Sequence, residues 1–344
     1  MPAPDTAPPP HGSLQPDDKA DVQTDGQAGR QQARPVTDAG GTPIPEGSGD
    51  RPLHEYGRPA VIEDASNRYF IHPLSALAAK AAIALSISPN AISILGLGFG
   101  LLAGWLYYHL PQAGSAIGGF AAMVCWHILD GADGRVARAT GQTSALGRVI
   151  DGVCDHVVFT AVYVALALHL VESGQSPAIW WLVVGAGVSH AVQAAGYEER
   201  RQRYQRRAAG MSARRADTGA VTDTGTGFDI RVLPVRLYEG AQKLVTGSDN
   251  GLDARLADLD GTERGQRLRA LALRSTAGMV RVWSLLNANN RTLMIFVTAL
   301  AGQPLLYFVF ELVVLNLVMA GLLLAERRQE KALVTQSLRL YQPF

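Results

Sequence analysis

Six apolar segments follow residue 88, and they limit the fold to a bundle of membrane-spanning helices. The segments cover roughly residues 89–110, 114–135, 146–170, 176–197, 290–303 and 304–326. A helix needs about 20 residues to cross the hydrocarbon core of a bilayer. The fifth segment is short, and the sequence AGQP at 301–304 separates it from the sixth. One helix over 290–326 would be much longer than a bilayer requires, so we expect two helices joined by a tight turn.

The positions of the basic residues support six crossings. All 31 Lys and Arg residues fall in 1–80, 135–148, 200–291 or 327–344. Six crossings place these four regions on one side of the membrane. Because regions rich in Lys and Arg stay in the cytoplasm, we expect both termini and the 135–148 loop to be cytoplasmic, with the chain in a bacterial inner membrane. An odd number of crossings would break this agreement.

The regions between the apolar segments complete the expected organisation. Residues 1–60 are rich in Pro, Gly, Asp and Gln, so we expect a disordered cytoplasmic tail. Residues 61–199 contain an amphipathic helix on the inner leaflet, over 67–88, and the first four spans. Residues 200–289 form a cytoplasmic insertion, residues 290–328 the last two spans, and residues 329–344 a cytoplasmic tail. The fold class is therefore an all-α integral membrane protein with six transmembrane helices.

Composition excludes several other classes. Cys125 and Cys154 lie in or beside apolar segments, which argues against a disulfide framework, and they form no metal-binding motif. The net charge of +1 gives no sign of a nucleic-acid partner, and we expect none. Gly96, Gly100 and Gly104 recur every four residues in the first span, a pattern typical of close helix packing.

The stretch DGADGRVARATGQTSALGRVIDGVCD, residues 130–155, places four aspartates where two apolar segments meet the membrane surface. On a helix that continues through residue 138, one arc of about 140° would contain the following residues: Asp130, Asp133, Gly134, Ala137 and Arg138. Asp151 and Asp155 are four apart, so they stack on one face of the next helix. Solvated helix caps explain one or two such residues, but not four.

Four carboxylates this close would repel one another unless cations neutralised them. Carboxylate oxygens suit Mg²⁺ or Mn²⁺, which also bind substrate phosphates. A pair of such ions is the usual clamp for displacement at phosphorus. Gly134 and Ala137 would leave room for a bulky ligand, and Arg138 offers a planar fork for phosphate. Ser144 would donate a hydrogen bond, and Gly147 would let the helices start close together.

The spacing Asp-x2-Asp-Gly-x2-Ala-Arg-x8-Gly-x3-Asp-x3-Asp in residues 130–155 resembles the signature of the CDP-alcohol phosphotransferases, also called CDP-alcohol phosphatidyltransferases. The resemblance covers about residues 67–200 and 290–328. It implies a homodimer of six-helix chains with two divalent ions, Mg²⁺ or Mn²⁺, in a cytoplasm-facing site. Such enzymes act in phospholipid biosynthesis. They transfer a substituted phosphate from a CDP-linked donor, here expected to be CDP-diacylglycerol, to an alcohol, and they release CMP.

The resemblance also implies roles for single residues. It implies four metal ligands: Asp130, Asp133, Asp151 and Asp155. Asp155 is also implied as the general base that deprotonates the alcohol. The residues implied to hold the CDP group are Gly134, Arg138 and Ser144, together with Asn90 and Ser93 of the segment PNAIS. Ala137 and Gly147 complete the signature as packing positions.

Several interpretations stay open at this point. A prenyltransferase with Asp-rich motifs is an alternative, although that family pairs Asp with Asn and lacks the Gly-x2-Ala-Arg element. A cation transporter is less favoured because no later segment repeats 130–155. Glu311 either lines an acceptor pocket or pairs with a polar neighbour. The arginines of 200–207 bind anions or only reflect the positive-inside bias. His127 and His156 are expected to be packed helix residues. The acceptor alcohol is not identified.

Overall fold

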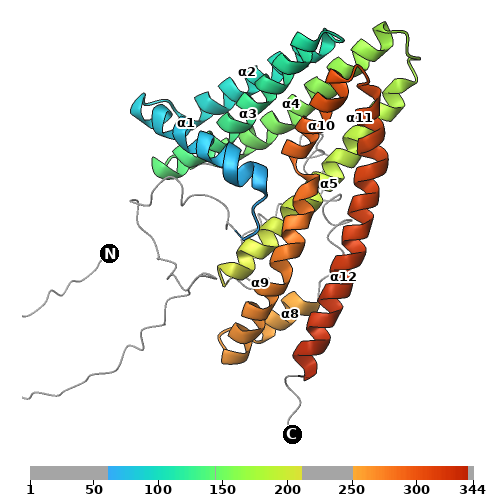
Figure 1. The fold of residues 1–344 in the computed structure, drawn as a ribbon. Helices are drawn as coiled ribbons and strands as arrows, with labels where there is room; N and C mark the ends of the chain where they lie inside the picture. Colours follow the sequence, from blue (N-terminus) through green and yellow to red (C-terminus); the bar gives the residue numbers. More distant parts are fainter. Residues whose placement is uncertain (1–60, 144, 211–250, 340–344) are drawn as a thin grey trace, which may run out of the picture. The chain divides into compact units, whose positions relative to one another are not determined.

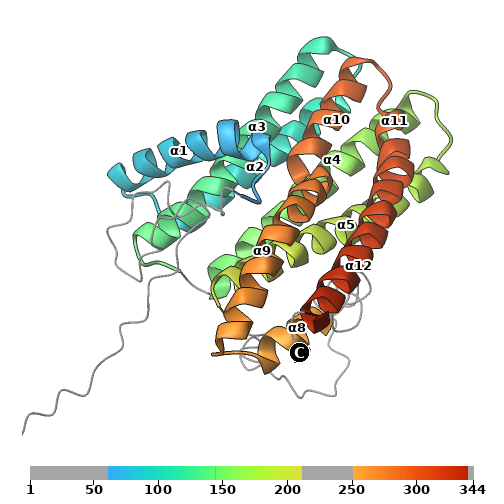
Figure 2. The same cartoon turned by 60° about the horizontal axis from the view of Figure 1, so that its bottom comes forward.

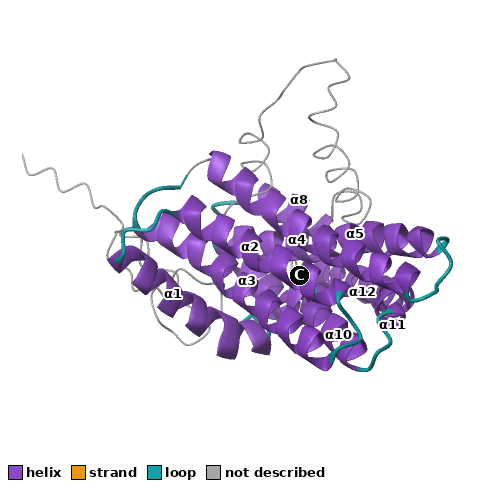
Figure 3. Cartoon of the chain, turned by 90° about the horizontal axis from the view of Figure 1, so that it is seen from above, coloured by secondary structure: helices purple, strands orange, loops and turns teal. Residues whose placement is uncertain are grey.

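The structure, a computed structural model, describes residues 61–143, 145–210 and 251–339, and within them the side chains of all but 145–152 and 337–339. Every regular element in these ranges is a helix, as predicted (Figures 1 and 3). The elements are η2 (Asn67–Ile71), α1 (His72–Ala84), α2 (Pro89–Tyr108), α3 (Ala113–Ala139), α4 (Ala145–Glu172), α5 (Ile179–Ala208), α8 (Gly251–Asp258), α9 (Glu263–Trp283), η3 (Ser284–Leu286), α10 (Ala288–Leu300), α11 (Leu305–Val309), η4 (Phe310–Leu315) and α12 (Asn316–Arg339). The predicted tail over 1–60 lies outside the described residues.

Five helices in the described part of the chain are long and apolar enough to cross a membrane. They are α2, α3, residues 153–172 of α4, α5, and the run 305–336 through α11, η4 and α12. The predicted fifth crossing, over 290–303, corresponds to α10, which has only 13 residues. At about 1.5 Å per residue, α10 is about 20 Å long, against about 30 Å of hydrocarbon. The coarser prediction of a helical membrane protein is confirmed, and the count of six crossings stays a prediction.

The predicted break after residue 300 is confirmed. α10 ends at Leu300, and α11 begins at Leu305. Gly302 has φ +67°, a left-handed conformation that glycine adopts without a steric penalty and that commonly ends helices. The second half of this hairpin continues as helix to Arg339, beyond the predicted end of the span at 326.

Side chains with capping oxygens begin several of these helices. Ser88 Oγ accepts a hydrogen bond from the Ala91 amide at 3.3 Å, and Pro89 occupies the first turn of α2. Thr262 caps α9 and Asn287 caps α10 in the same way. A helix, α1, lies within the segment 67–88 for which an interfacial helix is predicted, and it packs against α3. Its amphipathic, interfacial character stays a prediction.

α2 packs against both α3 and α4, and its glycines permit the close approach, as predicted. A Cβ on Gly100 would lie 2.2 Å from Val158 Cγ2, and one on Gly104 would lie 3.3 Å from the Ala161 backbone. A Cβ on Gly96 would lie 3.4 Å from Leu129 Cβ of α3. α2 therefore holds the two helices that carry the aspartates. On the other side of the bundle, α9 lies along α5 and α12, with α8 beside it (Figure 2).

We expect Gly100→Ala to destabilise the fold by about 1–3 kcal/mol, because the added methyl overlaps Val158 in a packed interface. Gly98→Ala on the same helix is the matched control, since nothing lies within 4 Å of its added Cβ. That control should be neutral or slightly stabilising, because Ala favours helix over Gly. Thermal unfolding of the purified variants measures both effects. Equal melting temperatures for the two variants would contradict the packing of α2 on α4.

Candidate active site at the ends of α3 and α4

The signature residues lie on two consecutive helices, as predicted. The last turns of α3 carry Asp130, Asp133, Gly134, Ala137 and Arg138, and the helix ends at Ala139. α4 begins at Ala145 and carries Gly147, Asp151 and Asp155. Ser144 lies outside the described residues, as does the side chain of Asp151.

An aromatic contact fixes how the two helices face each other. The Trp126 ring of α3 meets the Phe159 ring of α4 edge-on, with centroids 5.4 Å apart. The short connection makes the helices antiparallel, so one turn beyond the contact brings Asp130 on α3 and Asp155 on α4 to the same level. Both aspartates are half-buried. The next turn carries Asp133 on one helix and Asp151 on the other. Helix spacing therefore predicts that the four positions lie on facing sides of one gap.

α2 also reaches this gap. Ser93 Oγ donates a hydrogen bond to Asp133 Oδ2 at 2.5 Å, and both residues are buried. The other oxygen of Asp133, Oδ1, accepts a hydrogen bond from the Gly134 amide. Asn90 lies on the first turn of α2 and is exposed. The sequence assigned Ser93 to the CDP group, whereas its described partner is the Asp133 carboxylate of the signature.

Arg138 uses the space that Gly134 leaves. A Cβ on Gly134 would lie 3.3 Å from Arg138 Nη1, although Arg138 is otherwise exposed. Ala137, next to Arg138, is partly exposed. The small residues and the arginine therefore line one surface of the α3 end, where a guanidinium can meet a phosphate.

The chemistry of the donor set fits hard divalent ions. The signature offers only carboxylate oxygens, which are the ligands that Mg²⁺ and Mn²⁺ prefer. Among the described side chains, which exclude that of Asp151, no three His, Cys, Asp or Glu residues gather closely enough to hold a metal. His127 does not join the site, because its Nε2 is hydrogen-bonded to Thr292 Oγ1 at 2.9 Å and its ring packs at a tilt against Trp126. The prediction of a packed histidine is confirmed for His127.

A second polar cluster lies in the bundle interior, and the sequence revealed only part of it. Glu311 of η4 is fully buried and pairs with Arg291 of α10, whose Nε lies 3.2 Å from Oε2. Arg291 also donates to Gln193 Oε1 at 2.6 Å, and Tyr307 donates to Glu311 at 3.1 Å. Of the two roles predicted for Glu311, pairing with a polar neighbour is confirmed. The sequence did not identify Arg291 as a member of this cluster, although its position at the start of an apolar segment was a signal that it could be buried.

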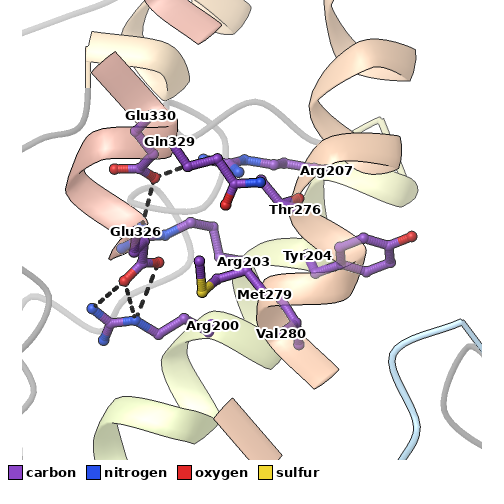
Figure 4. A pocket seen from close by; sticks show the side chains of 10 residues that line it. All are labelled: Arg200, Arg203, Tyr204, Arg207, Thr276, Met279, Val280, Glu326, Gln329 and Glu330. Carbon is purple, nitrogen blue, oxygen red and sulfur yellow. Dashed lines mark hydrogen bonds and ion pairs between the residues drawn. The ribbon is translucent and has the colours of Figure 1, made fainter. Parts of the chain in front are cut away.

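The arginines at the end of α5 face α9 and α12 across a small pocket (Figure 4). The pocket holds about 300 Å³, including space open to solvent. Arg200 pairs with Glu326 at 2.9 Å, and Arg207 pairs with Asp253 at 2.7 Å. Arg203 lies 3.6 Å from Glu330. Carboxylates of the same chain therefore balance these arginines, and their contacts tie three helices together.

Comparison with known proteins supports the resemblance seen in the signature. Residues 86–228 match the family model for CDP-alcohol phosphatidyltransferase. The chain is 36% identical over 114 residues to a CDP-diacylglycerol--serine O-phosphatidyltransferase of Mycobacterium tuberculosis, a match that covers 33% of this chain and 38% of the relative. It is 34% identical over 89 residues to an archaetidylinositol phosphate synthase of Pyrococcus horikoshii, covering 26% of this chain and 45% of the relative. A bifunctional IPC transferase and DIPP synthase of Aquifex aeolicus is 36% identical over 86 residues, or 25% of this chain and 19% of the relative.

The matched region contains α2, α3, α4 and α5, and with them the whole signature. The chain spans well under half the length of the mycobacterial relative that it matches. The matches thus bear on the helices that build the gap.

Proposed function

We propose that the protein is a membrane CDP-alcohol phosphatidyltransferase of phospholipid biosynthesis. It transfers a substituted phosphate, phosphatidyl from CDP-diacylglycerol, to an alcohol and releases CMP. The observation that carries this proposal is the Trp126–Phe159 contact, which sets the signature-bearing ends of α3 and α4 against each other within the region that matches the family model. Relatives that act on CDP-linked lipids, by their names, support the choice of donor.

Each signature side chain has its own role in such a transfer. Asp130, Asp133, Asp151 and Asp155 would hold two divalent ions, which supply charge neutralisation at the pyrophosphate oxygens when bound. Asp155 takes the proton of the acceptor hydroxyl, so that the alcohol oxygen forms a bond to the lipid-bearing phosphorus. The bond from that phosphorus to the CMP oxygen breaks, and CMP leaves with its electron pair. Arg138 stabilises the phosphate charge that develops on CMP.

Space and positioning residues complete the proposed site. Gly134 and Ala137 leave the α3 surface open for the nucleotide, and Asn90 on the exposed first turn of α2 contacts it. Ser144, in the loop between the helices, donates a hydrogen bond to the CDP group. Gly147 allows α4 to begin close to α3.

Serine and inositol phosphate are the first acceptors to test, because the relatives' names mention serine and archaetidylinositol phosphate. Purified protein in lipid with CDP-diacylglycerol should release CMP when one alcohol of a panel is added. The panel includes glycerol 3-phosphate, inositol, choline and ethanolamine as well. Omission of the divalent ion should abolish release. If the protein released no CMP with any alcohol of the panel, the proposed reaction would be contradicted.

We infer six crossings, with α10 as the fifth and both termini in the cytoplasm. Two contacts between α3 and α10 show the direction in which α10 runs. His127 meets Thr292 near one end of α10, and Phe120 stacks on Phe296 near the other, with centroids 4.4 Å apart. α10 therefore runs antiparallel to α3, so that the turn at 301–304 lies toward the end of the bundle where α3 begins. The family resemblance supports a homodimer.

The side of the membrane on which the C-terminus lies distinguishes six crossings from five. A reporter fused after Phe344 should read as cytoplasmic if α10 crosses, and as periplasmic if it does not. Fusions after Gln112 and Arg207 are the controls, with periplasmic and cytoplasmic readings expected in both cases. A periplasmic reading at the C-terminus would overturn the count of six crossings.

A further inference from the structure

Ser93 belongs to neither helix of the signature, yet it contacts the signature directly. It lies on the second turn of α2, and its hydroxyl reaches Asp133 on α3, 40 residues away in the chain. Both side chains are more than nine-tenths buried, with exposed fractions of 8% for Ser93 and 5% for Asp133. The contact is therefore an interior one between two helices.

The Ser93 hydroxyl has one proton and two acceptors within reach. Asp133 Oδ2 lies 2.5 Å away, and the Pro89 carbonyl lies 3.3 Å away. A hydroxyl donates one proton, and a hydrogen bond to a charged carboxylate is about twice as strong as one to a neutral carbonyl. The Ser93 hydroxyl therefore donates its hydrogen bond to Asp133.

The backbone around Ser93 is fixed by packing. Ser88 caps the start of α2 through its hydrogen bond to the Ala91 amide. One turn after Ser93, the space for a Cβ on Gly96 is bounded by Leu129 Cβ at 3.4 Å and by Trp126 Cδ1 at 3.5 Å. α2 can thus hold the hydroxyl at a constant position relative to α3.

We propose that Ser93 is a positioning residue that orients the Asp133 carboxylate toward the divalent ion, and that it does not contact the nucleotide. With Oδ2 held by Ser93 and Oδ1 by the Gly134 amide, the orientation of the carboxylate plane is fixed. Hydrogen bonds of this kind orient metal ligands and raise metal affinity. With 8% of Ser93 exposed, little of its hydroxyl is open to a nucleotide. This inference rests on the proposed function.

The test measures metal binding without substrate. Mn²⁺ binding to purified full-length protein is followed by electron paramagnetic resonance for wild type, Ser93→Ala, Ser93→Thr and Ser115→Ala. We expect Ser93→Ala to weaken Mn²⁺ binding about 10-fold or more, the usual effect of losing such a partner. Ser93→Thr keeps the hydroxyl and should restore most of the affinity. Ser115 has the same 8% exposure but lies on the first turn of α3, so Ser115→Ala should bind like wild type.

Kinetics separate the two roles of Ser93. A positioning role predicts that Ser93→Ala raises the metal concentration for half-maximal activity, while KM for the CDP-linked donor at saturating metal stays unchanged. Equal Mn²⁺ binding by Ser93→Ala and wild type, or a raised donor KM with unchanged metal dependence, would overturn this inference alone. Failure of wild type to bind Mn²⁺ would overturn the metal step of the proposed function and this inference with it.

Discussion

Asp155→Asn should lower the rate of CMP release by about 10²- to 10⁴-fold, the range that a lost general base usually costs. Asn has nearly the shape of Asp, so α4 and its contacts with α2 should persist. An amide, however, cannot take the proton of the acceptor hydroxyl, and it is a weaker ligand for a hard divalent ion. The measurement is the initial rate of CMP release at saturating donor and acceptor.

The control for Asp155→Asn removes a carboxylate elsewhere. Glu263→Gln breaks a pair with Arg267 in which both side chains are 77% exposed. Exposed pairs of this kind contribute about 0–1 kcal/mol, so this variant should keep the wild-type rate and stability. If Asp155→Asn also kept the wild-type rate, Asp155 would be neither the base nor an essential ligand.

The second large effect concerns the buried pair between α10 and η4. Arg291→Met should lower the free energy of unfolding by about 3–5 kcal/mol, because it leaves the Glu311 carboxylate fully buried without its cation. The variant also leaves Gln193 Oε1 and the Leu286 carbonyl without the guanidinium that now donates to them. Unfolding in mixed micelles of increasing denaturing detergent measures the change.

Two further variants test whether the buried, unpaired charge causes that loss of stability. Arg291→Met combined with Glu311→Met removes both charges and should recover a large part of the lost stability, since an apolar pair of similar volume replaces a buried ion pair well. Arg267→Met removes an exposed arginine and should change stability by less than about 0.5 kcal/mol. A loss for Arg291→Met no larger than that for Arg267→Met would show that Glu311 does not depend on Arg291.

The sequence predicted the parts of this molecule that follow from local patterns. The apolar segments, the break at 301–304 and the glycine face of α2 each depend on residues close together in the chain. The same holds for the signature, because spacings of three and four residues on a helix place side chains on one face. Gly100 against Val158 and the end of α10 at Leu300 match those predictions.

The sequence could not predict contacts between helices that are far apart in the chain. No spacing relates Ser93 to Asp133, or Gln193 to Arg291, since these pairs depend on how the bundle assembles. Arg291 looked like the last member of a cytoplasmic loop, but it is fully buried with a partner 20 residues later. Likewise, the sequence left the arginines of 200–207 as anion-binding residues or as a result of the positive-inside bias, and their pairing with carboxylates of α8 and α12 could not be predicted from it.

The most direct test of the proposed reaction counts both of its products. Purified protein is incubated with CDP-diacylglycerol, Mn²⁺ or Mg²⁺, and an isotope-labelled alcohol from the panel, and CMP and labelled phospholipid are measured in the same sample. Transfer predicts equal amounts of the two products, with both lost after chelation of the metal and both strongly reduced in Asp155→Asn. CMP formed without labelled lipid, or products that persist after chelation, would contradict a metal-dependent transfer at the α3–α4 site.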